Sequence, residues 1–273
     1  MLSIRTNGVA LQAAGSLART NRSLSSSLSK ISTGKRTSEI GVDSAGLAVS
    51  VNLDTRSQSY TAAVRNINDG ISVVQTAEQV IDSTTDLLQR MRELSVQSAS
   101  ETLAAPERSF IVDEFDVLRT ELQRLGLESE FNGIKLADGT VPTVGVQVGI
   151  DGGADSQISL EMPDLRSVFF GVNTSSVSSA ADARTTIDAV DTQLLAVNSD
   201  RATLGAGHNR LLSALNSAGT NQMALTSASS RIVDTDFATE TAKLSKLQVM
   251  QSAGISALGQ SRTLSRAVLE LVR

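Results

Sequence analysis

The chain has 273 residues, of which only 3% are aromatic, and its formal net charge is −5 at pH 7. This balance excludes nucleic acid and anionic membranes as main partners, because both need a basic surface. The absence of Cys excludes thiol chemistry, while the lack of an apolar run near about 18 residues and of a signal-like N-terminal core argues against membrane insertion and export by the general secretory route.

Residues 1–46 are predicted to form a helix followed by a linker. Apolar side chains recur there at a spacing of three or four, which is typical of one helix face. These residues are Leu17, Leu24, Leu28 and Ile31. Glycines at positions 34, 41 and 46 then break the period. The segment GVDSAG lacks the Lys and the preceding strand of a phosphate-binding loop, so we interpret it as a hinge in which Asp43 caps the next helix.

Two amphipathic helices are predicted next, over about 47–103 and 106–126, with Pro106 in the first turn of the second. The first contains the stretch LLQRMRELSVQSA, residues 87–99. Its apolar face carries Leu87, Met91 and Leu94. Its polar side carries Gln89, Arg90, Glu93 and Gln97. Without further information this polar side is a solvated face, on which a pair between Arg90 and Glu93 contributes about 0.2–0.5 kcal/mol.

The middle of the chain has a different pattern. A β-hairpin is predicted over about 141–163, because VGVQVGI and QISLEM alternate apolar and polar residues around the turn sequence DGGADS. Asp151 and Asp155 in that turn lack the loop and bidentate acid of a calcium site. The Ser-rich residues 164–181 are expected to be irregular. Within them NTSSVSS is a plain loop or a site for surface O-glycans.

Another long helix is predicted over 183–232, because apolar residues recur every 3.5 positions on average, as in a coiled coil. They are Ile187, Val190, Leu194, Val197, Leu204, Leu211, Leu215, Ala218, Leu225 and Ile232. The single His208 lies on this stripe. One His without Cys cannot assemble a catalytic triad or a metal site, so we expect it to pack beside Arg201 or Arg210.

The last segment, residues 235–273, returns to helical spacing. Its apolar positions include Leu244, Leu247, Leu258, Leu264, Val268 and Leu271. Both chain ends therefore carry apolar stripes that lack an obvious internal partner, and helices this rich in Ser and Gln are marginal in isolation. We expect the two ends to pair with each other and with neighbouring copies.

Together these elements predict a mainly α fold, a long antiparallel coiled-coil-like helical rod with one small β-hairpin region. No pattern supports a catalytic, cofactor or metal site. The HExxH motif is absent, and carboxylate pairs such as Asp113 and Asp116 are ordinary solvated residues. We therefore predict that the chain is not an enzyme.

Several segments resemble successive signature segments of bacterial flagellin. They are KISTGKRTSEIGVDSAGLAV, RNINDGISVVQTAEQ, LLQRMRELSVQSA, EFNGIKL and SRIVDTDFATETAKLSKLQVMQSAGISALGQ. They lie in the family's order within about the first 135 and the last 90 residues. The resemblance implies a minimal flagellin without the variable outer domains, which polymerises into the helical flagellar filament used for motility.

The resemblance also implies a division into three parts. Residues 1–46 would form an N-terminal inner-tube helix and linker, residues 47–234 a core rod, and residues 235–273 a C-terminal inner-tube helix. Assembly through the terminal helices would use the apolar residues named above. Contacts between non-identical patches build an open filament. We expect aspartate at Leu258 or Leu264 to leave the monomer soluble but to abolish polymerisation, because it would place a charge in such a contact.

Further partners follow from the resemblance. They are sibling flagellins, an export chaperone, the filament cap and hook-junction proteins, with secretion by the flagellar type III route into an extracellular filament that some bacteria sheathe. In many flagellins the LLQRMRELSVQSA segment is recognised by vertebrate Toll-like receptor 5 and is buried between protofilaments. The matching residues are Leu88, Gln89, Arg90, Leu94, Gln97 and Glu114.

Two alternatives remain open at the level of sequence. A hook-filament junction protein shares related terminal helices, and a chemoreceptor-like signalling coiled coil uses similar Ala-, Ser- and Gln-rich heptads. The C-terminal sequence LGQSRTLSRAVLELVR also departs from the family, with Arg262 and Ser265 in place of its usual pattern. This departure leaves the filament pitch, the chaperone fit and copolymerisation with sibling subunits undecided.

Overall fold

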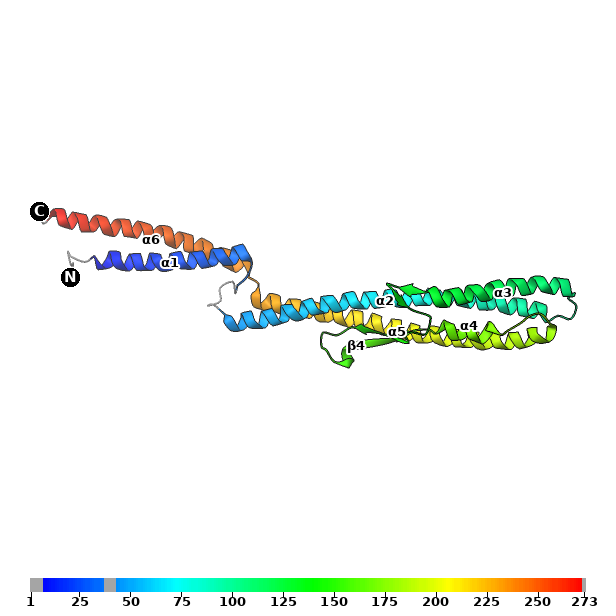
Figure 1. The fold of residues 1–273 in the computed structure, drawn as a ribbon. Helices are drawn as coiled ribbons and strands as arrows, with labels where there is room; N and C mark the ends of the chain where they lie inside the picture. The colour runs from blue at the N-terminus through cyan, green and yellow to red at the C-terminus, as the bar shows by residue number, and fades with distance from the viewer. Residues whose placement is uncertain (1–6, 37–42, 272–273) are drawn as a thin grey trace. The chain divides into compact units, whose positions relative to one another are not determined.

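The computed structural model describes residues 7–36 and 43–271, which form six α-helices and two small antiparallel hairpins (Figure 1). The expected mainly α fold is confirmed. The chain divides into two compact units. One combines the residues up to Thr55 with those from Ala224 onward, and the other comprises Arg56–Met223.

The helices agree with most of the predicted segments. They are α1 (Gly8–Thr33), α2 (Ser44–Ser98), α3 (Ala105–Glu128), α4 (Leu165–Asn173), α5 (Ala180–Val233) and α6 (Phe237–Leu271). The strands are β1 (Glu130–Phe131), β2 (Ile134–Lys135), β3 (Thr143–Gln147) and β4 (Gln157–Glu161), with the short 3-10 helix η1 (Ala154–Ser156) before β4. Helix α2 ends before the predicted residue 103, where the Ser100 N–H donates to the Gln97 carbonyl in a tighter turn.

Short polar side chains define where several helices begin. Asn7 Oδ1 accepts a hydrogen bond from the Ala10 N–H at 3.0 Å, and Asp43 Oδ1 accepts one from the Gly46 N–H at 2.8 Å. Each bond satisfies a backbone donor that has no partner inside the helix. The predicted capping role of Asp43 is confirmed.

In the unit Arg56–Met223, α2 and α5 pack antiparallel along a heptad seam. On α2 one row of buried positions alternates by three and four residues, and Val73, Thr85 and Leu94 are buried beside it. The row is Ala63, Ile67, Gly70, Val74, Ala77, Ile81, Thr84, Leu88, Met91, Ser95 and Ser98. On α5 buried apolar residues recur every seventh residue. They are Ala183, Val190, Val197, Leu204, Leu211 and Ala218. Arg92 Nε lies 2.5 Å from Asp191 Oδ1, and Arg201 pairs with Asp82, so the two helices run in opposite directions.

His208 lies beside an acid. Its Nδ1 is 3.9 Å from Glu78 Oε1, a neighbour that was not predicted, and packing beside Arg201 or Arg210 stays a prediction. Arg201 is held by Asp82 across the helix pair. The sequence alone does not reveal this, because the partner of His208 comes from α2 and depends on the register of the two helices.

The predicted β-hairpin is confirmed as β3 and β4, which pair from Thr143 opposite Glu161 to Gln147 opposite Gln157. Its buried side chains pack against the helix pair. Gly70 of α2 provides room for this contact, because a Cβ at this position would lie only 2.8 Å from Val146 Cγ2. The hairpin thus covers part of the α2–α5 seam.

Two small elements were not predicted. The first is the β1–β2 hairpin, whose turn residues Asn132 and Gly133 both have positive φ, as the Asn-Gly turn requires. The second is α4, so the expectation that residues 164–181 are irregular is wrong for Leu165–Asn173. Asp164 Oδ1 caps this helix by accepting a hydrogen bond from the Ser167 N–H at 3.1 Å.

Candidate functional site

The first candidate site is a polar surface that α2 and α3 share. We call Gln89, Arg90, Glu93, Gln97 and Glu114 the α2–α3 surface; all five residues are exposed. The heptad spacing turns their α2 members away from the buried seam. This geometry makes the surface accessible to a partner in the free subunit.

Arg90 is the centre of the α2–α3 surface. Its Nη2 donates to Glu114 Oε1 at 2.6 Å, and its Nη1 donates to Glu93 Oε2 at 2.9 Å. The hydrogen bonds that Arg90 donates to Glu114, and then to Glu93, raise the pKa of Arg90 above its ordinary value. The guanidinium therefore links the two helices and stays charged, although an exposed pair of this kind adds little to stability.

Leu88 and Leu94 are not part of this surface in the folded subunit. Leu88 is completely buried and Leu94 is 2% exposed, so both belong to the core. The core side of this stretch therefore includes Leu88 as well as the expected Met91 and Leu94, and the expected Leu87 is only half-buried against it. A partner that meets the folded subunit can touch Gln89, Arg90, Gln97 and Glu114 directly, whereas Leu88 and Leu94 hold these residues in place.

The second candidate site is the pair formed by α1 and α6, which lie side by side (Figure 1). Three polar contacts cross it. Ser27 Oγ donates to Glu240 Oε1 at 2.5 Å, Gln251 Nε2 donates to Asn21 Oδ1 at 2.9 Å, and Asn7 Nδ2 donates to the Ser261 carbonyl at 3.0 Å. Along these contacts the residue numbers fall on α1 as they rise on α6, so the two helices are antiparallel.

Only part of the apolar surface of α1 and α6 is used in this pairing. The residues buried or half-buried between the helices are Leu17, Leu24, Ile31, Leu244, Leu247 and Leu258. Large apolar residues remain exposed on the other faces. They include Val9, Leu11, Leu28, Val249, Met250 and Ile255. Leu28 therefore lies outside the pair. The side chains of Leu264, Val268 and Leu271 lie outside the described residues.

Glu240 should make the α1–α6 pair sensitive to acid. Its carboxylate accepts hydrogen bonds from Ser27 Oγ and from Lys243 Nζ, and the bond from Ser27 is the main cause that lowers the pKa of Glu240. Because the pKa of Glu240 is lower in the folded state than in the unfolded state, its ionised form stabilises the pair at any pH above the unfolded-state pKa of about 4.3. This contribution is lost as the pH falls through the folded-state pKa.

Thermal unfolding followed by circular dichroism from about pH 6 to about pH 3 measures this contribution as the difference between wild type and Glu240→Gln. We expect wild type to be more stable near neutral pH and the difference to shrink below about pH 4. A difference that stays constant over this range would contradict a role for the ionised Glu240.

Two features are absent from the residues that the structure describes. No group of three or more His, Asp and Glu side chains among them could hold a metal ion. Within the same residues no helix is long and apolar enough to cross a membrane. The features that stand out in this part of the chain are surfaces suited to contact with other proteins.

Two family models match this chain. Residues 4–141 match the model of the bacterial flagellin N-terminal helical region, and residues 187–272 match that of the bacterial flagellin C-terminal helical region. The chain belongs to the bacterial flagellin family. Only residues 142–186 separate the two matches, so this flagellin lacks the variable domain. It is a structural subunit of the flagellar filament.

Full-length relatives agree with this assignment. A flagellin from Halalkalibacterium halodurans is 37% identical over 90% of each chain, and flagellin FlaB2 of Treponema pallidum is 31% identical over 99% of each chain. The crystal structure of Bacillus cereus flagellin superposes with a TM-score of 0.52 at 28% identity, covering 56% of this flagellin and 88% of that chain. The filament subunit is thus supported over a hook-junction protein or a chemoreceptor-like coiled coil.

The structure adds one site that the sequence analysis missed. Helix α4 and the C-terminal end of α3 enclose a pocket that includes Leu127, Phe169 and Phe170. The signal was present in the sequence, because Leu165, Val168, Phe169 and Val172 follow the spacing of one helix face. The Ser-rich residues after Asn173 obscured it.

Proposed function

We propose that α1 and α6 polymerise this flagellin by forming the inner tube of the filament. In this proposal residues 1–46 and 235–273 are the inner-tube segments and residues 47–234 are the rod. The observation that supports it is the set of exposed apolar side chains on the outer faces of both helices, including Val249 at 69% and Ile255 at 57% exposure. Large apolar side chains exposed on both helices of one pair favour an interaction site.

The same helices suit secretion through the flagellar type III route. Their pairing contains polar contacts, and its leucines other than Leu247 are only half-buried, which favours a weakly stabilised pair that opens for passage of the chain. An export chaperone would cover the apolar face of α6 before secretion. After secretion the same face would contact neighbouring subunits, the filament cap and the hook-junction proteins.

The α2–α3 surface is proposed as a second contact between subunits, which Toll-like receptor 5 would recognise on free monomer. The direct contacts would come from Gln89, Arg90, Gln97 and Glu114. Arg90 supports this role because it is half-exposed and joins residues from two helices into one charged surface. Such a surface sets the specificity of a contact more than its affinity.

Electron microscopy of the purified protein tests this proposal. Wild type should form long homopolymers, and Arg90→Ala should form filaments that dissociate at a lower temperature and monomer that activates the receptor less. The subunit itself should melt at nearly the wild-type temperature, because the ion pairs of Arg90 are exposed.

Arg184→Ala is the matched control, since Arg184 forms an exposed ion pair with Glu101 away from the α2–α3 surface. Its filaments and its receptor activation should equal those of wild type. Failure of wild type to polymerise would contradict the inner-tube proposal. Unchanged filaments together with unchanged receptor activation in Arg90→Ala would return the α2–α3 surface to a merely solvated face.

A further inference from the structure

Helix α4 and the C-terminal end of α3 enclose an apolar pocket of about 280 Å³. Gly126 and Leu127 line one side, and Phe169 and Phe170 line the other. The two phenyl rings are tilted by 56° with centroids 5.6 Å apart, and Phe170 is 55% exposed. Because a cavity of about 150 Å³ already holds benzene, this pocket is large enough for one phenyl ring.

Arg166 places a positive charge at the edge of this pocket. Its guanidinium carbon lies 5.5 Å from the centroid of the Phe170 ring, and it forms no ion pair with any described residue. An occupant that carries an aromatic tip with a carboxylate beside it would complement both the apolar pocket and the charge.

Helix α3 itself carries an exposed aromatic side chain with a carboxylate beside it. Phe110 is 73% exposed and Val117 is 68% exposed, and Asp113 lies between them on the same face. Asp113 forms no ion pair with another residue that the structure describes. We call Phe110, Asp113 and Val117 the α3 knob.

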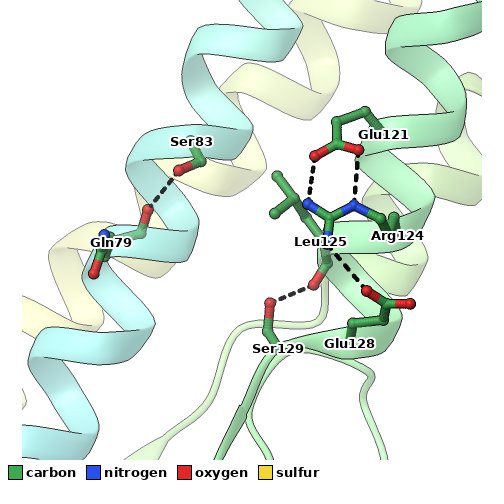
Figure 2. A network of polar contacts seen from close by, with 7 residues as sticks. All are labelled: Gln79, Ser83, Glu121, Arg124, Leu125, Glu128 and Ser129. Carbon is green, nitrogen blue, oxygen red and sulfur yellow. Dashed lines mark hydrogen bonds and ion pairs between the residues drawn. The ribbon is translucent and has the colours of Figure 1, made fainter.

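Arg124 is not available as the counter-charge of the knob. Figure 2 shows its guanidinium held between Glu121 and Glu128, with Nη2 donating to Glu121 Oε1 at 2.5 Å and Nη1 donating to Glu128 Oε2 at 3.0 Å. The hydrogen bond from Arg124 lowers the pKa of Glu121, which keeps this cluster ionised and internally paired. Arg166 is therefore the better partner for Asp113.

The knob cannot enter the pocket of its own subunit. Phe110 and Gly126 belong to the same continuous helix, and 16 residues at 1.5 Å each separate them by about 24 Å. We propose that Phe110 of one flagellin subunit enters the α3–α4 pocket of a second copy, while Asp113 pairs with Arg166. This contact rests on the proposed homopolymer. It joins two different patches, so each subunit can bind one copy at its knob and another at its pocket, which extends an open chain.

Disulfide trapping tests the contact cleanly, because the wild-type chain has no Cys. Assembled Asp113→Cys/Arg166→Cys protein should give a ladder of dimers, trimers and larger species on oxidation, and each single variant should stay monomeric. A disulfide between the two cysteines of one chain is excluded. Arg166 lines the same pocket as Gly126, and Asp113 lies about 20 Å from Gly126 along α3, whereas a disulfide needs Cα atoms within about 7 Å. Ser213→Cys/Arg166→Cys, with the first Cys on an exposed position of α5, is the control and should give no ladder.

Charge exchange tests the same pair without crosslinks. Asp113→Arg should raise the critical concentration for polymerisation at least about tenfold, and Asp113→Arg/Arg166→Asp should restore it to within about threefold of wild type. Two results would overturn the contact, provided that wild type still forms filaments. In the first, the double-cysteine variant polymerises but gives no ladder on oxidation. In the second, the critical concentration of Asp113→Arg/Arg166→Asp is as high as that of Asp113→Arg. Absence of wild-type filaments would instead overturn the proposed homopolymer.

Discussion

Replacing Val249 or Ile255 with aspartate should leave a folded, soluble flagellin subunit that no longer forms filaments. Both side chains are exposed on α6, on faces that do not meet α1. A carboxylate there remains hydrated in the monomer, so the fold is unaffected. In a packed contact between subunits the same carboxylate would be buried without a partner, which costs several kcal/mol.

Two measurements separate assembly from folding in these variants. Circular dichroism should give the wild-type helix content and melting curve, while sedimentation and electron microscopy should find no polymer. Gln248→Asp is the control, because Gln248 is an exposed polar neighbour on α6 and its replacement should leave polymerisation intact. Normal filaments from both Val249→Asp and Ile255→Asp would rule out assembly through this face.

Leu258, which the sequence alone suggested for this test, is less suitable. It is half-buried on the side of α6 that faces α1, so aspartate there would disturb the pair as well as the polymer. Leu264 was the other choice, and its side chain lies outside the described residues. Val249 and Ile255 separate the two effects because their side chains do not take part in the pair.

Leu88→Ala should destabilise the rod unit by about 2–5 kcal/mol, the usual cost of truncating a fully buried leucine. The cost arises because the lost methyl groups leave a cavity at the α2–α5 seam. Urea unfolding of the monomer measures it as a lower midpoint at constant slope. Any loss of receptor activation in this variant should therefore follow the loss of folded protein.

Leu195→Ala is the control for this substitution. Leu195 lies on α5 and is 72% exposed, so its truncation should change the free energy of unfolding by no more than about 0.5 kcal/mol. Equal stability of Leu88→Ala and Leu195→Ala would contradict the placement of Leu88 in the core.

The long helices could be predicted because one physical rule governs them. A buried seam needs apolar or small residues every 3.5 positions, and Val190, Val197 and Leu204 show this period in the sequence itself. The β3–β4 hairpin was equally accessible, since alternation and a Gly-rich turn are local signals. The family resemblance then identified the function that the surfaces of these elements support.

Other features depend on contacts that no local pattern contains. Whether Leu87 or Leu88 faces the core is decided by the position of α5, because both are apolar and adjacent. Leu28 fits the stripe of α1 by type but lies outside the contact with α6. The α3–α4 pocket requires two helices separated by two hairpins to come together, and the sequence gives no measure of that approach.

The seven-residue interval on α5 also limits which mutations this flagellin can accept. An α-helix turns by about 100° per residue, so deletion of a single residue between Ala183 and Ala218 would swing every later seam position out of contact with α2. The turn between β3 and β4 has no such constraint, because residues 151–155 are exposed and continue neither helix of the seam. Changes in chain length should therefore accumulate in this turn, while α5 keeps its residue count.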